Sequence, residues 1–217
     1  MKRILGTLLL SLSLIGSVAH ASPAAPVAGK DYTILKTPQS VDAPAGKIEV
    51  TEFFWYGCPH CNKFDPFLES WIKKQGPDVV FKRVPVAFRD DFIPHSKMYY
   101  ALDALGLAQK LTPAVFHEIH ENKNYLLTPE DQAKFLQTQG VDPKKYLEAY
   151  NSFSTQSALQ RDKGLLDAYK IDGVPTIAIQ GKYETGPAMI QAPEDKALPG
   201  TLQVMDFIIS QIRAKKM

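Results

Sequence analysis

Two dense apolar runs stand out in a chain whose other apolar residues recur every three or four positions. Such density is typical of strands that are buried on both faces of a sheet. Shorter stretches bounded by turn residues predict three further strands, and the last two are separated by a hairpin turn. Strands are therefore predicted at residues 31–35, 47–55, 79–88, 177–179 and 183–190.

In the rest of the chain the apolar residues have the spacing of helices, most continuously between the third and fourth predicted strands. Three sites there place an N-cap residue before a proline suited to the first helical position: Thr112-Pro113, Thr128-Pro129 and Asp142-Pro143. The element order predicts an α/β fold with a parallel centre, an antiparallel edge and a helical insertion. Helices are predicted at residues 62–75, 95–105, 113–122, 129–138, 143–151, 155–170 and 199–213.

The N-terminal residues have the pattern of a cleaved export signal. Lys2 and Arg3 precede an apolar run, and Ala19-His20-Ala21 forms a small-x-small cleavage site. We therefore expect residues 1–21 to be a signal peptide and Ser22 to begin the mature protein. The alternative is a retained membrane anchor, although the apolar run is short for a membrane span.

The charge balance argues against a nucleic-acid-binding protein. The chain has 25 Lys and Arg against 23 Asp and Glu, and two of the basic residues lie in the expected signal peptide. The mature chain would therefore be close to neutral, and no basic patch is visible in its sequence.

The only two cysteines form the motif Cys58-Pro59-His60-Cys61, where a predicted strand meets a helix. Unpaired N–H groups and the helix dipole stabilise a thiolate at a helix start, and a protonated His60 would add a positive neighbour. We expect Cys58 at the exposed end of the turn to be the attacking and attacked sulfur. Cys61 should be the shielded resolving thiol, because helical spacing places it with Phe64, Leu68, Trp71 and Ile72.

Three other interpretations of the cysteine pair remain. Zinc needs two more ligands, for which His117 and His120 are the only spaced candidates; these are more simply a polar helix face, and no metal is predicted. A purely structural disulfide between residues this close would restrict the unfolded chain little. Two buried, inert thiols are the third interpretation.

Glu52 interrupts the predicted strand that precedes the cysteines. Burial of an ionised carboxylate is costly, so its pKa should rise. It could exchange protons with the thiols or tune them, or it could lie at a strand edge and reach water. Lys82 or Arg83 in the next strand could pair with it.

The chain resembles the DsbA family of periplasmic thiol:disulfide interchange proteins, which have the thioredoxin fold. The resemblance rests on the Cys-Pro-His-Cys motif, Pro66 five residues after it, Gly173-Val174-Pro175-Thr176 before a strand, and the helical insert. It implies a signal peptide at residues 1–21, a thioredoxin-like domain at 22–93 and 171–217, and a helical insertion subdomain at 94–170.

This resemblance implies a periplasmic oxidase that donates its Cys58–Cys61 disulfide to exported proteins through a mixed disulfide. A quinone-linked membrane oxidase of the DsbB type would reoxidise it, and an apolar groove near the motif would serve both partners. No cofactor beyond the disulfide and no oligomer beyond a monomer is implied. Pro175 should be a cis-proline facing the disulfide. The implied catalytic residues are Cys58, Pro59, His60, Cys61, Pro175 and Glu52, with substrate contacts from Val174 and Thr176.

Two other functions are consistent with the sequence. The first needs the same motif and the second does not. An isomerase or reductase would also need the two cysteines, but family isomerases carry an N-terminal dimerisation domain and usually Thr where this chain has Val174. A chaperone that only binds unfolded exported chains would not need Cys58. Pro175 could also be an ordinary trans turn residue before an edge strand.

Overall fold

The computed structural model describes residues 25–216, so the predicted signal peptide lies outside the described residues. Within them, a five-stranded mixed sheet has the order β1-β5-β4-β2-β3. The strands match the predicted positions, but β3 and β5 end earlier than the sequence suggests. Their bounds are β1 Thr33–Ile34, β2 Ile48–Phe54, β3 Val79–Pro85, β4 Thr176–Ile179 and β5 Tyr183–Thr185.

The sheet is parallel only between β2 and β3, at one edge. β4 runs antiparallel to both β2 and β5, and β1 runs antiparallel to β5. The predicted parallel centre is therefore wrong. The chain returns from the helical segment to the other side of β2 with its direction reversed, which makes the centre antiparallel. The mixed sheet with its flanking helices confirms the predicted α/β class.

The described part of the chain contains seven α-helices, and five of them lie between β3 and β4. Short 3₁₀ turns at Asp90–Phe92 and Pro187–Met189 precede α2 and α7. The helices are α1 Pro59–Ile72, α2 Ile93–Ala104, α3 Ala108–His120, α4 Pro129–Thr138, α5 Pro143–Tyr150, α6 Phe153–Tyr169 and α7 Glu194–Arg213.

Two of the three predicted proline-led helix starts are confirmed. The Thr128 and Asp142 side chains accept backbone N–H groups at the starts of α4 and α5. The start at Thr112-Pro113 is wrong, because α3 already begins at Ala108 and contains Pro113. There the Thr112 hydroxyl donates to the Ala108 carbonyl at 2.9 Å instead of capping a helix.

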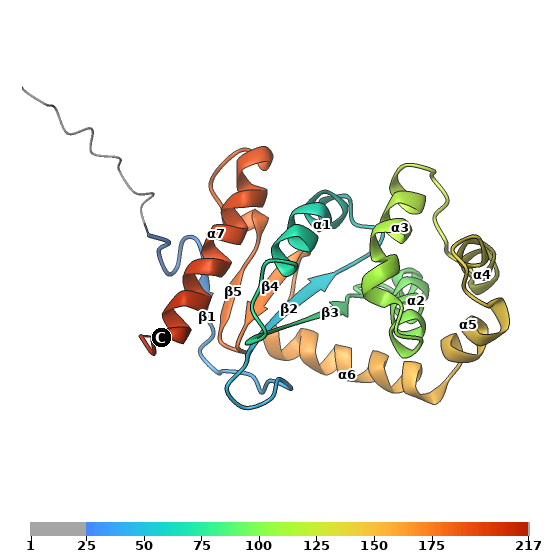
Figure 1. The fold of residues 1–217 in the computed structure, drawn as a ribbon, viewed down its shortest axis with the longest axis horizontal. Helices are drawn as coiled ribbons and strands as arrows, with labels where there is room; N and C mark the ends of the chain where they lie inside the picture. Colours follow the sequence, from blue (N-terminus) through green and yellow to red (C-terminus); the bar gives the residue numbers. More distant parts are fainter. Residues whose placement is uncertain (1–24, 217) are drawn as a thin grey trace, which may run out of the picture.

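The two faces of the sheet are covered by different helices. Side chains of α1 and α7 pack with those of β2 and β4 in one apolar cluster. The C-terminal end of α6 packs on the opposite face through residues such as Leu165, Leu166 and Tyr169. Figure 1 shows α6 running from beside α5 back to the strands. No helix within residues 25–216 is both long and apolar enough to cross a membrane.

A third apolar cluster joins the end of β2 to the helices of the insert. It contains Phe54, Tyr56 and both cysteines together with side chains from α2 to α5. Most aromatic side chains of these helices are buried, namely Tyr99, Phe116, Phe135, Tyr146 and Tyr150, and Tyr100 is partly buried. The cysteine motif therefore lies where the sheet meets the helical segment.

Candidate functional site: the Cys58–Cys61 dithiol and its surroundings

The motif occupies the turn from β2 into α1. Cys58 is the N-cap residue of α1 with an extended backbone, and its N–H donates to the Trp55 carbonyl at 2.9 Å. The helix starts at Pro59, three residues before the predicted start at Asn62. Pro59 suits the first turn because its missing N–H would have no helical partner there. Cys61 thus lies within the first turn of the helix.

Both cysteines are free thiols, and both are buried. Cys61 is 0% exposed, which confirms its predicted shielded position, whereas Cys58 is 7% exposed. The prediction that Cys58 lies exposed at the end of the turn is therefore wrong for the residue as a whole. Its sulfur packs against another segment, where the thiol donates to the Val174 carbonyl across 3.5 Å. It remains the more accessible of the two cysteines.

The two thiols have opposite acidities. The pKa of Cys58 is lowered to about 6, first by the hydrogen bond from the Cys61 thiol, which outweighs the opposing effect of burial. Backbone N–H groups of Cys61 and His60 lower it further, and the charge of His60 contributes last. The pKa of Cys61 is raised well above its usual value by burial and by its hydrogen bond to Cys58. The site therefore favours a Cys58 thiolate beside a protonated Cys61.

The His60 side chain lies at the surface and pairs with a residue that the sequence analysis did not identify. Its Nδ1 is 3.0 Å from Oε1 of Glu194, in the first turn of α7. The other carboxylate oxygen of Glu194 is 2.6 Å from Nζ of Lys63. We call these three residues the surface cluster. Glu194 was missed because a contact between residues 134 positions apart leaves no local signal in the sequence.

The segment before β4 faces the cysteines. The Val174–Pro175 peptide bond is cis, as the resemblance implied. The Val174 carbonyl lies against the Cys58 sulfur, and the Thr176 hydroxyl donates to the Gly173 carbonyl at 2.8 Å. This loop therefore brings main-chain groups to the sulfur from a distant part of the sequence.

An apolar groove of about 920 Å³ opens beside this loop. His60 and Glu194 line it together with Val174, Pro175 and Thr176. The remaining apolar lining includes side chains from the segment before α7 and from α7 itself, among them Met189, Ile190 and Leu198. The groove that we expected near the motif is therefore present.

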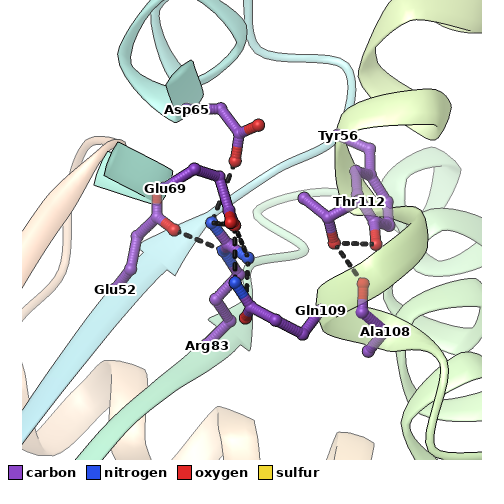
Figure 2. Close-up of polar contacts among 8 residues, drawn as sticks. All are labelled: Glu52, Tyr56, Asp65, Glu69, Arg83, Ala108, Gln109 and Thr112. Atoms are coloured by element: carbon purple, nitrogen blue, oxygen red, sulfur yellow. Dashed lines mark hydrogen bonds and ion pairs between the residues drawn. The ribbon is translucent and has the colours of Figure 1, made fainter. Parts of the chain in front are cut away.

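Glu52 is buried and paired with Arg83. Its side chain is 1% exposed, and its Oε2 accepts from Nε of Arg83 at 2.7 Å, as Figure 2 shows. Of the two expected partners, Arg83 is therefore the one that binds Glu52. Lys82 points elsewhere and lies 2.9 Å from Glu49 and 3.2 Å from Asp42. A strand-edge position that reaches water is excluded for Glu52.

Arg83 also binds three side chains that the sequence analysis did not link to it. Its guanidinium lies 2.9 Å from Asp65 and 3.2 Å from Glu69, both on α1, and 3.3 Å from the Gln109 amide oxygen on α3 (Figure 2). With Glu52 these residues form what we call the buried cluster. The spacing of Cys61, Asp65 and Glu69 at intervals of four was the available signal that all three share one helix face.

The buried cluster perturbs the acids within it. Burial raises the pKa of Glu52, and Arg83 opposes this rise. Burial likewise raises the pKa of Asp65 to about 7, again against the effect of Arg83. Burial alone would lower the pKa of Arg83, but the charges of Glu52 and Asp65 raise it, so the guanidinium stays charged.

The two histidines considered as zinc ligands both belong to α3. His117 is exposed on α3, whereas His120 is half-buried and its Nε2 lies 2.8 Å from the Tyr56 carbonyl. His120 is therefore not simply part of a polar face. In residues 25–216, no three His, Cys, Asp or Glu side chains are grouped as metal ligands.

Comparison with known proteins points to one family. The model of the DSBA-like thioredoxin domain matches residues 49–198. The chain is 59% identical over 217 residues to a thiol:disulfide interchange protein DsbA of Burkholderia cepacia, with 100% of both chains covered. It is 40% identical over 211 residues to the protein of the same name from Pseudomonas aeruginosa PAO1, with 97% of this chain and 96% of the relative covered.

Solved structures agree with these sequence matches. The crystal structure of Pseudomonas aeruginosa DsbA superposes with a TM-score of 0.81 at 39% identity and covers 88% of this chain and 96% of its own. The oxidoreductase DsbA of Xylella fastidiosa superposes with a TM-score of 0.78 at 33% identity, covering 87% and 98%.

Proposed function

Because this chain belongs to the DSBA-like thioredoxin family and is a thiol:disulfide interchange protein, we propose that it oxidises dithiols of newly exported proteins in the periplasm. In this role it donates its own Cys58–Cys61 disulfide. The observation that carries the proposal is the opposite acidity of the two thiols. A disulfide is a strong oxidant when its reduced form is stabilised, and a stabilised Cys58 thiolate has this effect.

The proposed reaction consists of two thiol–disulfide exchanges. A substrate thiolate attacks the Cys58 sulfur, the Cys58–Cys61 bond breaks, and Cys61 leaves as a thiolate that takes up a proton. A second substrate thiolate then attacks the substrate sulfur of the mixed disulfide and displaces the Cys58 thiolate. Two electrons pass from the substrate dithiol to the protein. The low pKa of Cys58 makes it a good leaving group in the second exchange.

The other residues of the site support this chemistry. Val174, whose carbonyl meets the Cys58 sulfur, can offer main-chain hydrogen bonds to an extended substrate, with Pro175 and Thr176 shaping the same loop. Pro59 and His60 set the turn and the N–H groups around the thiolate. Glu52 lies among the charges that raise the pKa of Cys61 and would tune proton uptake there.

The remaining parts of the proposal concern partners and organisation. A quinone-linked membrane oxidase of the DsbB type would reoxidise the dithiol by attack of Cys58 on its disulfide, and no cofactor besides the disulfide takes part. We propose a monomer secreted through a signal peptide at residues 1–21. Its thioredoxin-like domain would comprise residues 22–93 and 171–217, and residues 94–170 would form the helical insertion, in keeping with the five helices between β3 and β4.

Single cysteine variants test the roles of the two sulfurs. Cys58→Ser should lose all disulfide exchange with a model dithiol peptide. Cys61→Ser should accumulate mixed disulfides with glutathione or substrate, because the resolving thiol is absent. Non-reducing gels and mass spectrometry of both variants distinguish these outcomes. Equal exchange rates in the two variants would refute the assignment, and full function of Cys58→Ala would favour a chaperone that only binds unfolded chains.

The direction of exchange is tested by equilibrating residues 22–217 with glutathione buffers and trapping the free thiols by alkylation. An oxidase should have its disulfide reduced even in strongly oxidising buffers, because its dithiol form is stabilised. A disulfide that persists until the buffer is strongly reducing would indicate a reductase or a structural bond instead.

A further inference from the structure

The surface cluster occupies a position from which it can act on the redox pair. His60 lies between the two cysteines in the sequence, yet its imidazole is bound to Glu194 at 3.0 Å and its side chain is 67% exposed. Glu194 belongs to α7, so α7 and α1 meet through this contact at one wall of the groove. The carboxylate is also held by Lys63, which is one helical turn beyond His60 on α1.

The contact changes what His60 can contribute to Cys58. A protonated imidazole near a thiolate stabilises the thiolate, but a carboxylate bound to the imidazole offsets much of that field. The charge of His60 lowers the pKa of Cys58, although less than the hydrogen bonds from the Cys61 thiol and from the two backbone N–H groups do. Glu194 binds the His60 side chain, so the side-chain contribution is the part that it can control.

We propose that Glu194 is a positioning residue that keeps the His60 imidazole paired with a carboxylate and thereby moderates the oxidising power of the Cys58–Cys61 disulfide. The inference rests on the proposed function, in which Cys58 is the exchanging sulfur. Removal of the carboxylate leaves the His60 charge uncompensated and its ring free to approach the sulfur. The thiolate is then stabilised further, and the disulfide becomes easier to reduce.

The variant Glu194→Gln tests this directly, because glutamine keeps the shape of the side chain and removes its charge. Asp195→Asn is the matched control, since it removes one negative charge from the neighbouring exposed residue in the same turn of α7. The Cys58 thiolate is followed by its ultraviolet absorbance against pH in the reduced protein, and the disulfide is equilibrated with glutathione. We expect Glu194→Gln to lower the pKa of Cys58. The equilibrium constant with glutathione should change about twofold to fivefold in favour of the reduced protein, which is the range for an exposed ion pair.

A double-mutant cycle shows whether Glu194 acts through His60. In a His60→Ala background, Glu194→Gln should have no more effect on Cys58 than Asp195→Asn has. The inference is overturned if Glu194→Gln leaves the Cys58 pKa unchanged or raises it, or if its effect persists in full without His60. The thiolate titration needs no exchange partner, so this failure is distinct from that of the proposed function, which would show as a wild-type disulfide that resists reduction by glutathione.

Discussion

Helix α1 is flanked by two ionic clusters, and their difference lies in how much water reaches them. The surface cluster of His60, Lys63 and Glu194 lies at the start of the helix, where the Lys63 and Glu194 side chains are 53% and 41% exposed. The buried cluster lies on the inner face, where the Arg83 and Glu52 side chains are each 1% exposed. Both contain ion pairs of about the same length, 2.6–3.0 Å on the surface and 2.7–3.2 Å inside.

The comparison teaches that contact distance alone does not determine what an ion pair does. Water screens the surface cluster, so its contribution to stability is small and its effect is confined to neighbouring groups such as Cys58. In the buried cluster Arg83, Glu52 and Asp65 have lost nearly all of their hydration and depend on one another, so removal of one partner is severe. We therefore expect the surface cluster to tune reactivity and the buried cluster to maintain the fold beneath the cysteines.

The largest effect is expected for Arg83→Met. Loss of the guanidinium leaves Glu52, Asp65 and Glu69 close together without a cation, and breaking a buried pair in this way costs about 3–5 kcal/mol. Urea unfolding at pH 7 measures the loss. The control is Arg89→Met, since the Arg89 side chain is 67% exposed and binds Asp91, which is 60% exposed. Comparable losses in the two variants would contradict the distinction between the clusters.

A second effect is a pH dependence of stability that arises from Asp65. Its folded pKa is about 7 against an ordinary 3.8, so the folded protein binds a proton more tightly than the unfolded chain. The stability from this group is fully present below pH 3.8 and is lost as the pH rises through about 7. Asp162, bound to the Tyr100 hydroxyl, has the same shift and adds to the slope.

Asp65→Asn should therefore reduce the change in unfolding free energy between pH 4 and pH 7 by about 2–4 kcal/mol, because asparagine has no carboxylate to ionise. Asparagine keeps an oxygen that can accept from Arg83, so the geometry is preserved. Urea unfolding of wild type and variant across this pH range measures the difference. An unchanged slope would show that Asp65 titrates normally in the folded protein.

A smaller effect is expected for Lys82→Met, next to Arg83 in the same strand. The Lys82 side chain is 30% exposed and pairs with Glu49, which keeps two backbone N–H donors from Asp42 and Ala43 after the change. Loss of the pair should cost about 1 kcal/mol in urea unfolding. A loss of stability as large as that of Arg83→Met would mean that burial does not explain a difference between Lys82 and Arg83.

The smallest effect on stability is expected for Glu194→Gln. The carboxylate is solvated on the surface, so its loss should leave the denaturation midpoint of the reduced protein unchanged while it shifts the glutathione equilibrium. Urea unfolding under reducing conditions is the check. A shifted midpoint would show that the surface cluster holds α1 and α7 together.

Local patterns in the sequence predicted much of this arrangement. The cysteine motif, the strands around it and the caps of α4 and α5 depend on neighbouring residues, and the structure has them close to the predicted positions. Proline led to one error, because Pro113 was interpreted as a helix start; the final helix was predicted to begin at Pro199 and instead begins at Glu194. Both prolines lie inside helices, in α3 and α7. Packing of the surrounding turns outweighs the one hydrogen bond that each proline removes.

Long-range contacts could not be predicted from the sequence. The choice between Lys82 and Arg83 depends on which side of β3 faces α1, and a one-residue shift in register reverses that choice. Glu194 meets His60, and Gln109 meets Arg83, only because α7 and α3 pack beside α1. The burial of Cys58 likewise depends on the Val174 loop, which lies 116 residues away in the chain.

The central claim is that the two thiols of one motif differ strongly in acidity. It is tested most directly by titration of the reduced protein, with thiolate formation followed by ultraviolet absorbance and each cysteine identified by pH-dependent alkylation and mass spectrometry. The account predicts that Cys58 ionises near pH 6 while Cys61 stays protonated beyond pH 9. Two thiols that ionise together near pH 9, the ordinary value, would contradict it.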